Sequence, residues 1–240
     1  MRKILKVLTV LLLSMAFTPG LLADPWNVND PIDYTVPALG TSWIGGYVYN
    51  PVQPVLEGYG GLFKIHNNNT GADIYTFCLE MDENIHDGDY VAGISDSAQN
   101  GGRNTDSGDP LGDATKWLYG QYLDGASGYQ NAQALQLAIW WLEGEFHDWG
   151  GSDPLAAWAS FYNGRVSGIG TLAAGYIQAA EAAEAAGTAI PSDIRVLNLK
   201  DTINGGCSQD YIIRVVPEPA SLLLLGTGLI GLALVRRRIG

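Results

Sequence analysis

The sequence predicts an α+β domain in which a helical insertion packs on an antiparallel β-sheet or sandwich. Short β-rich segments with turn signals between them occupy the N-terminal half of the body and return near its end. Between these segments, apolar residues recur every three or four positions, as they do on one face of a helix. Strands come first, helices second and strands last, so we expect a single α+β domain.

The N-terminal half contains three expected strands. Residues 43–49 follow an entry segment rich in Pro, Asn and Gly, and residues 62–65 and 74–79 are further β-rich runs. The segment 67–71 reads Asn-Asn-Asn-Thr-Gly, which is a strong turn signal between the last two runs. These features together predict a hairpin-rich half.

The middle of the chain contains four expected helices. Asp-Pro pairs at 109–110 and 153–154 predict helix starts, because a capping residue precedes proline at the first helical position. Gly125, Gly164 and Gly187 predict helix ends. The expected helices cover residues 109–125, 131–146, 153–164 and 172–186, and strands are expected again over 194–199 and 211–216.

The composition excludes several functional classes. The chain has 13 Lys plus Arg against 25 Asp plus Glu, a formal net charge of −12, so it lacks the cationic surplus that nucleic acid requires. Its two cysteines and three histidines show no metal-binding spacing, and we expect neither a metal nor another cofactor. No catalytic motif is present, so we expect no enzyme.

The segment around His86 is the nearest approach to a metal motif. Asp82, Asn84, His86 and Asp87 resemble a calcium-binding EF-hand loop only superficially. Asp87 stands where such a loop needs glycine, and no bidentate glutamate closes it. We therefore expect His86 to be a surface or hydrogen-bonded histidine.

The first 23 residues have the three-part layout of a secretory signal peptide. Arg2, Lys3 and Lys6 precede an apolar run at 7–13, and the segment ends at the small residue Ala23. Signal peptidase is expected to cut after Ala23. The chain is therefore predicted to be exported.

Residues 216–240 combine a short proline motif, an apolar helix and a cluster of arginines. The apolar run 220–235 makes about 24 Å of helix against a hydrocarbon core of about 30 Å, so we expect a single transmembrane helix. The arginines predict that its C-terminal end faces the cytoplasm. The motif is Pro217, Glu218 and Pro219, and the cluster is Arg236, Arg237 and Arg238.

This tail resembles the PEP-CTERM sorting signal. In that family the signal is recognised by exosortase, a membrane transpeptidase-like enzyme of Gram-negative bacteria that make extracellular polysaccharide. The resemblance implies transient anchoring in the inner membrane, cutting near the motif, and transfer of the body to the outer cell surface or extracellular matrix. The predicted organisation is a signal peptide at 1–23, a secreted domain at 24–215 and a sorting signal at 216–240.

Cys78 and Gln136 are the two chemically notable residues of the body. Along the strand 74–79, side chains alternate between faces, which puts Cys78 on the more polar face, within reach of another element. On the second expected helix, Gln136 lies three or four positions from Ile139 and Trp140. Its carboxamide therefore sits among apolar groups and needs hydrogen-bond partners.

The motifs around these residues resemble those of bacterial surface thioester domains. The strand motif 77–80 reads Phe-Cys-Leu-Glu, and the helix motif 135–140 reads Leu-Gln-Leu-Ala-Ile-Trp. In that family the cysteine sulfur attacks the glutamine carbonyl, ammonia leaves, and the internal thioester reacts with an amine or hydroxyl on a target surface. The resemblance implies that Cys78 supplies the sulfur and Gln136 the acyl group of an adhesin. Leu135 stands where many such domains have threonine.

The second cysteine leaves an alternative open. Cys207 follows the turn-rich residues 204–206, and a secreted chain with two cysteines can form a Cys78–Cys207 disulfide between an early strand and the last one. The body would then be a non-covalent structural or glycan-binding protein of the extracellular polysaccharide. The sequence leaves a thioester, a disulfide and two thiols as alternatives.

Overall fold

The computed structural model describes residues 25–35, 43–48, 56–81, 83, 85–99, 108–146, 152–203 and 205–215, without the side chains of 43–48 and 56–60. Within these residues, Trp26–Val215 form one compact unit. The expected signal peptide and sorting signal, including Pro217, Glu218, Pro219 and the three arginines, lie outside the described residues. No helix in the described part of the chain is both long enough and apolar enough to cross a membrane.

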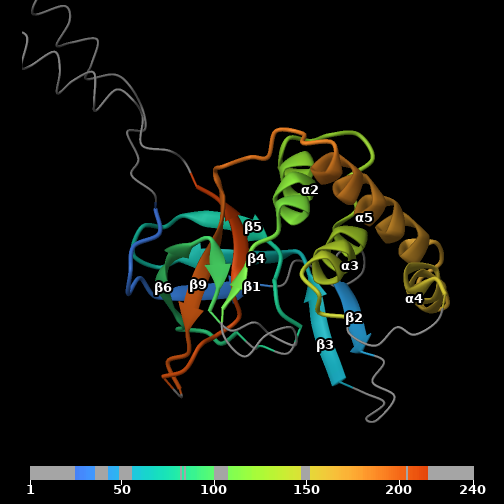
Figure 1. The fold of residues 1–240 in the computed structure, drawn as a ribbon. Helices are drawn as coiled ribbons and strands as arrows, with labels where there is room; N and C mark the ends of the chain where they lie inside the picture. Colours follow the sequence, from blue (N-terminus) through green and yellow to red (C-terminus); the bar gives the residue numbers. More distant parts are fainter. Residues whose placement is uncertain are drawn as a thin grey trace, which may run out of the picture. The chain divides into compact units, whose positions relative to one another are not determined.

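Two three-stranded antiparallel sheets form the β part of the fold (Figure 1). In the first sheet, β4 (Phe63–Asn67) lies between β1 (Ile32–Thr35) and β5 (Asp73–Thr76). In the second, β9 (Ile194–Lys200) lies between β10 (Tyr211–Arg214) and β6 (Tyr90–Ser95). Two shorter antiparallel pairs join β2 (Trp43–Val48) to β3 (Leu56–Gly61) and β7 (Ser97–Ala98) to β8 (Asp109–Pro110).

Isolated bridges connect the two sheets at both edges. Cys78, just after β5, pairs with Tyr211 of β10 in an antiparallel bridge. On the other side, Pro31, just before β1, pairs with Tyr90 of β6. The strands therefore form a closed ring of hydrogen-bonded neighbours, and Cys78 lies at one of its seams.

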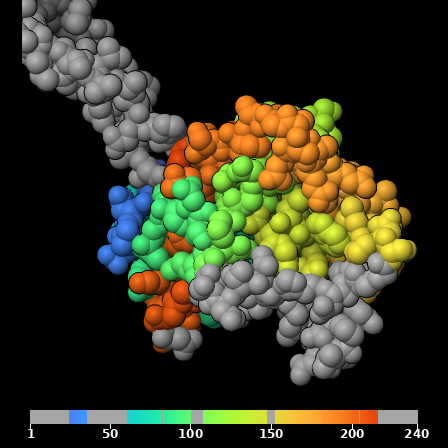
Figure 2. Space-filling model, in the orientation of Figure 1, coloured from blue at the N-terminus to red at the C-terminus, as the bar shows by residue number. Residues whose placement is uncertain are grey.

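Four helices, inserted between β8 and β9, lie together beside the sheets (Figure 1). They are α2 (Asp113–Leu123), α3 (Ala132–Leu142), α4 (Pro154–Asn163) and α5 (Ile169–Ala185). Helix α5 packs against the other three, α3 contacts β2 and β3, and α2 contacts β9. The space-filling view shows the yellow and light-orange helical residues beside the blue-green and red strand residues (Figure 2). This arrangement confirms the predicted α+β class.

Several predicted helix boundaries are confirmed by their caps. Asp153 accepts a hydrogen bond from the Ala156 backbone at 2.9 Å, with proline at the first helical position. Asn131 caps α3 in the same way, accepting from Ala134 at 2.9 Å. Gly187 follows α5 with a φ of 66°, a left-handed conformation that favours glycine.

Other local predictions are wrong. The Asp109-Pro110 pair forms strand β8 against β7, and α2 begins at Asp113. The strands β1, β3 and β6 were not expected, because their short or glycine-containing sequences carry a weak β pattern. Their places are set by pairing with neighbouring strands, which no local sequence signal reports.

Gly170 controls how closely α4 approaches α5. A Cβ atom at this position would lie 2.0 Å from the carbonyl oxygen of Ala159, whereas one at Gly175 of the same helix would meet nothing within 4 Å. We expect Gly170→Ala to destabilise the fold by about 1–3 kcal/mol, because the backbone at Ala159 must move. Gly175→Ala should stabilise it by about 0.5–1 kcal/mol. Thermal unfolding of the two variants checks this, and equal effects would contradict the packing.

Candidate functional site

Cys78 and Gln136 meet in the interior of the domain. The Cys78 side chain is 1% exposed and the Gln136 side chain is fully buried. The sulfur of Cys78 lies 3.3 Å from Oε1 of Gln136, with the thiol as donor. The two residues are 58 positions apart in the chain, and the fold brings them together by packing α3 against the strand seam.

Backbone groups hold the Gln136 carboxamide in one orientation. Its Oε1 accepts from the N–H groups of Cys78 at 3.2 Å and Gly61 at 3.3 Å. Its Nε2 donates to the carbonyl oxygen of Cys78 at 2.8 Å. These bonds offset the cost of burying an amide. Two N–H groups aimed at one carbonyl oxygen also have the arrangement of an oxyanion hole.

Another element, α3, reaches Cys78 as expected, but the burial of the residue was not foreseen. Phe77, Cys78 and Leu79 are all buried, because the segment pairs with β10 at the seam and α3 packs on it through Gln136. Both faces of the segment are therefore covered. The sulfur lies on the side that meets α3.

The surroundings keep the Cys78 thiol protonated. Burial raises the pKa of the thiol well above its ordinary value, and the nearby charges of Glu80 and Glu145 raise it further. Burial also raises the pKa of Glu80, and the negative charges of Asp210, Glu83 and Glu145 add to this effect. The sulfur is accordingly a neutral thiol that donates to the carbonyl oxygen, and not a preformed thiolate.

Buried acids help to fix the chain just after Cys78. Glu145, 1% exposed, accepts from the Met81 backbone at 2.9 Å. The Gln209 side chain donates to both the carbonyl oxygen and the carboxylate of Glu80, at 3.0 Å and 3.2 Å. Sequence reasoning missed these positioning contacts, because Glu145 is an ordinary polar residue beyond the end of a helix until the fold buries it.

The two cysteines lie in different surroundings in the structure. Cys78 is buried against Gln136. Cys207 is exposed in the loop between β9 and β10, where its backbone forms an isolated β-bridge with Lys200. No disulfide joins the two cysteines, both of which lie in described segments.

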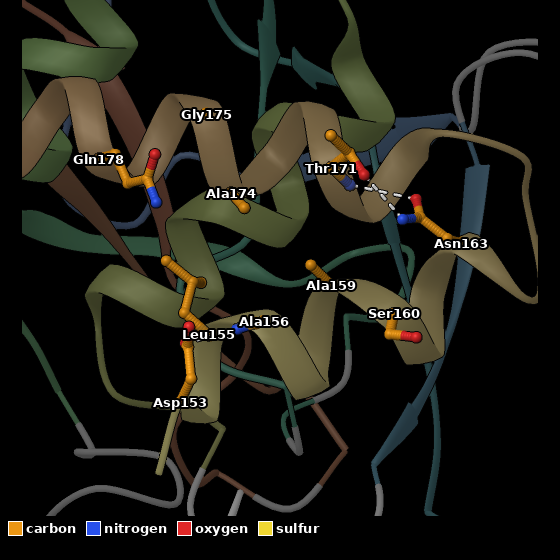
Figure 3. A pocket seen from close by; sticks show the side chains of 10 residues that line it. All are labelled: Asp153, Leu155, Ala156, Ala159, Ser160, Asn163, Thr171, Ala174, Gly175 and Gln178. Carbon is orange, nitrogen blue, oxygen red and sulfur yellow. Dashed lines mark hydrogen bonds between the residues drawn. The ribbon is translucent and has the colours of Figure 1, made fainter.

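A groove of about 520 Å³ lies between α4 and α5 (Figure 3). Asn163 and Thr171 face each other there, with the Asn163 amide donating to the Thr171 hydroxyl at 2.7 Å. Asp153, which caps α4, is the one ionisable side chain among the described residues of its lining. Neither Cys78 nor Gln136 lines the groove. It therefore contributes nothing to the chemistry of the pair.

Comparison with known proteins identifies the C-terminal segment. Residues 215–238 match the PEP-CTERM protein-sorting motif. No curated protein and no solved structure matches the chain. The match confirms the predicted sorting signal, and it leaves the resemblance of the body to surface thioester domains without support.

The motif defines the class of the protein. A chain with this signal is an exported substrate of exosortase. The protein is accordingly one that exosortase sorts to the cell surface, with the mixed α+β unit of Trp26–Val215 between its ends.

Buried carboxylates predict an acidic optimum of stability. Burial raises the pKa of Glu143 to about 7 and that of Asp210 to about 6. The folded state therefore holds these protons more tightly than the unfolded state, and stability falls as pH rises from about 4 to 7. Hydrogen bonds from Asn67 and its neighbours lower the pKa of Asp30 to about 2, so stability also falls as pH drops below 4. Melting temperatures measured from pH 3 to 8 should peak between about pH 4 and 5.

Glu143→Gln separates this effect from general charge repulsion. The variant keeps an oxygen for the Gly112 N–H, which donates to Glu143 at 3.3 Å. Between pH 5 and 8 the free energy of unfolding should fall by about 3 kcal/mol less in the variant than in the unaltered protein. Glu181→Gln, at an exposed position of α5, is the matched control and should leave the pH profile unchanged. Identical profiles for both variants would contradict the assignment to Glu143.

Proposed function

We propose that this exported protein attaches itself covalently to a surface through an internal thioester between Cys78 and Gln136. One observation carries the proposal: a buried thiol contacts a buried carboxamide whose oxygen accepts two backbone N–H bonds. A structural glutamine needs hydrogen-bond partners, but it does not need a thiol beside its carbonyl group. The arrangement fits a nucleophile and an acyl donor.

Formation of the thioester conserves all atoms of the pair except one ammonia. The sulfur of Cys78 attacks Cδ of Gln136, and the developing negative charge on Oε1 is stabilised by the N–H groups of Cys78 and Gly61. The C–N bond of the amide then breaks. The thiol proton moves to the departing nitrogen, which leaves as ammonia. The products are one C–S bond and one molecule of ammonia.

The N–H groups of Cys78 and Gly61 also serve the reaction of the thioester with its target. A primary amine or hydroxyl of the target attacks Cδ of Gln136 in the thioester, and the oxygen again lies between the N–H groups of Cys78 and Gly61. The C–S bond breaks, and the thiol takes up the proton that the nucleophile loses. The target is then joined to Gln136 as an amide or ester. Because the acyl group is consumed, the protein acts once and is no catalyst.

Burial suits this role because an exposed thioester would be hydrolysed by water. Trp140, one helical turn after Gln136, is fully buried and makes an edge contact with Phe146 at a centroid distance of 6.2 Å. Its ring helps to exclude solvent from the pair. With export by exosortase, the proposed function is that of a surface adhesin, with extracellular polysaccharide or a surface amine as its target.

The intact mass of the exported protein tests the proposal. The mature chain should weigh one ammonia less than its sequence, and it should take up methylamine, which is small enough to reach a buried bond. Cys78→Ala should abolish both the mass difference and the uptake. Cys207→Ser, the matched control at the exposed cysteine, should keep both.

Two results would overturn the proposal. The first is a full sequence mass with an unmodified Gln136 in the peptide map of freshly exported protein. The second is methylamine uptake that survives in Cys78→Ala. A peptide map that links Cys78 to Cys207 would instead establish the disulfide alternative.

A further inference from the structure

Three side chains that commonly bind metals meet beside the end of β9. They are His86, Asp89 and Asp201, and their ligand atoms all lie within 4.8 Å of one another. Asp89 is fully buried and Asp201 is 7% exposed, so both carboxylates are removed from bulk water. None of the three belongs to the Cys78–Gln136 pair.

The register of the second sheet accounts for this grouping. Tyr90, the first residue of β6, lies opposite Lys200, the last residue of β9. Asp89 and Asp201 stand one position beyond these partners, so the antiparallel pairing places them side by side. The sequence gives no sign of this, since the two carboxylates come from distant segments. The expectation that the chain has no metal site considered only ligands close together in sequence.

Neighbouring donors orient the carboxylates. Asp89 accepts from the backbone N–H of His86 at 2.9 Å and that of Thr202 at 3.3 Å, and also from the Ser208 hydroxyl. Asp201 accepts from the backbone of its own turn at 2.6 Å. Such outer contacts are the usual means of holding metal-binding carboxylates in place.

The imidazole of His86 supplies an independent observation. Its Nδ1 atom is shielded from solvent and has no hydrogen-bond partner in the described part of the chain. A buried polar nitrogen without a partner is costly, and most such atoms in proteins are satisfied. A cation held between this nitrogen and the two carboxylates would satisfy it and neutralise two buried negative charges.

We propose that His86, Asp89 and Asp201 bind a divalent transition-metal cation, for which Zn²⁺ is the best match. One imidazole nitrogen and two carboxylate oxygens suit Zn²⁺ at bond lengths of about 2.0–2.2 Å, with water as the fourth ligand. Ca²⁺ and Mg²⁺ fit less well, because they prefer shells of six or more oxygens. The cation fastens the loop after β9 to the turn before β6.

Titration of the full exported protein with Zn²⁺, after removal of metals by a chelator, tests the site. Calorimetry should show one strong site per chain. A hundredfold excess of free Zn²⁺ over its Kd should raise the Tm by about 5–10 °C. His86→Ala should weaken binding by about tenfold or more and remove most of the Tm shift. His66→Ala, which removes an exposed imidazole paired with Asp73, should change neither.

Two further variants make the result decisive. Asp201→Asn keeps the size of the side chain and an acceptor oxygen, so it should fold and lose affinity as His86→Ala does, even if His86→Ala fails to fold. Cys207→Ser should bind Zn²⁺ as tightly as the unaltered protein. Loss of binding in Cys207→Ser, unchanged binding in Asp201→Asn, a larger Tm shift with Ca²⁺ or Mg²⁺, or no shift with Zn²⁺ would each overturn the proposal.

Discussion

The buried carboxamide of Gln136 constrains the whole domain, because an amide in the interior must find hydrogen-bond partners for both ends. Its partners are backbone groups of Cys78, at the seam of the strand ring, and of Gly61, at the end of β3. Two separate parts of the chain therefore converge on one side chain of α3. If α3 shifted by one residue, the carboxamide would lose these partners. Its own polar atoms and those of its partners would then be buried without hydrogen bonds.

Two buried acids, Glu80 and Glu145, lie close to the same site. The segment after Cys78 follows the start of β10, where the Leu79 N–H donates to the carbonyl oxygen of Asp210 at 3.1 Å, and the N–H of Met81 needs another acceptor. Glu145 supplies one to Met81, and Glu80 is held by Gln209. Burial raises the pKa of the Cys78 thiol, and the charges of Glu80 and Glu145 raise it further, so the thiol stays protonated. The burial of Cys78 beside Glu80 and Glu145 thus explains why its thiol is neutral.

Sequence signals predicted the parts of this structure that are decided locally. The cap at Asp153, the helix start at Asn131 and the strand at 194–199 depend on neighbouring residues, and the structure confirms them. Strands β1 and β6 depend on pairing with distant partners, and they were missed. The Cys78–Gln136 contact was expected through a family resemblance, whereas the contribution of Gly61 was not foreseen. A backbone N–H carries no side-chain signal, so its role appears only when β3 is placed against α3.

The distance in sequence between Cys78 and Gln136 bears on when the proposed thioester can arise. The sulfur and the carboxamide approach each other only after α3 has packed on the strand seam, so an unfolded chain has no electrophile. Six of the 13 cationic residues lie near the two ends of the chain, while residues 24–218 contain 7 cationic against 25 acidic residues, a net charge of −18. Such a charge opposes close approach to anionic surfaces unless divalent ions screen it. Under the proposed function, attachment therefore requires a folded body and a target surface that is not strongly anionic.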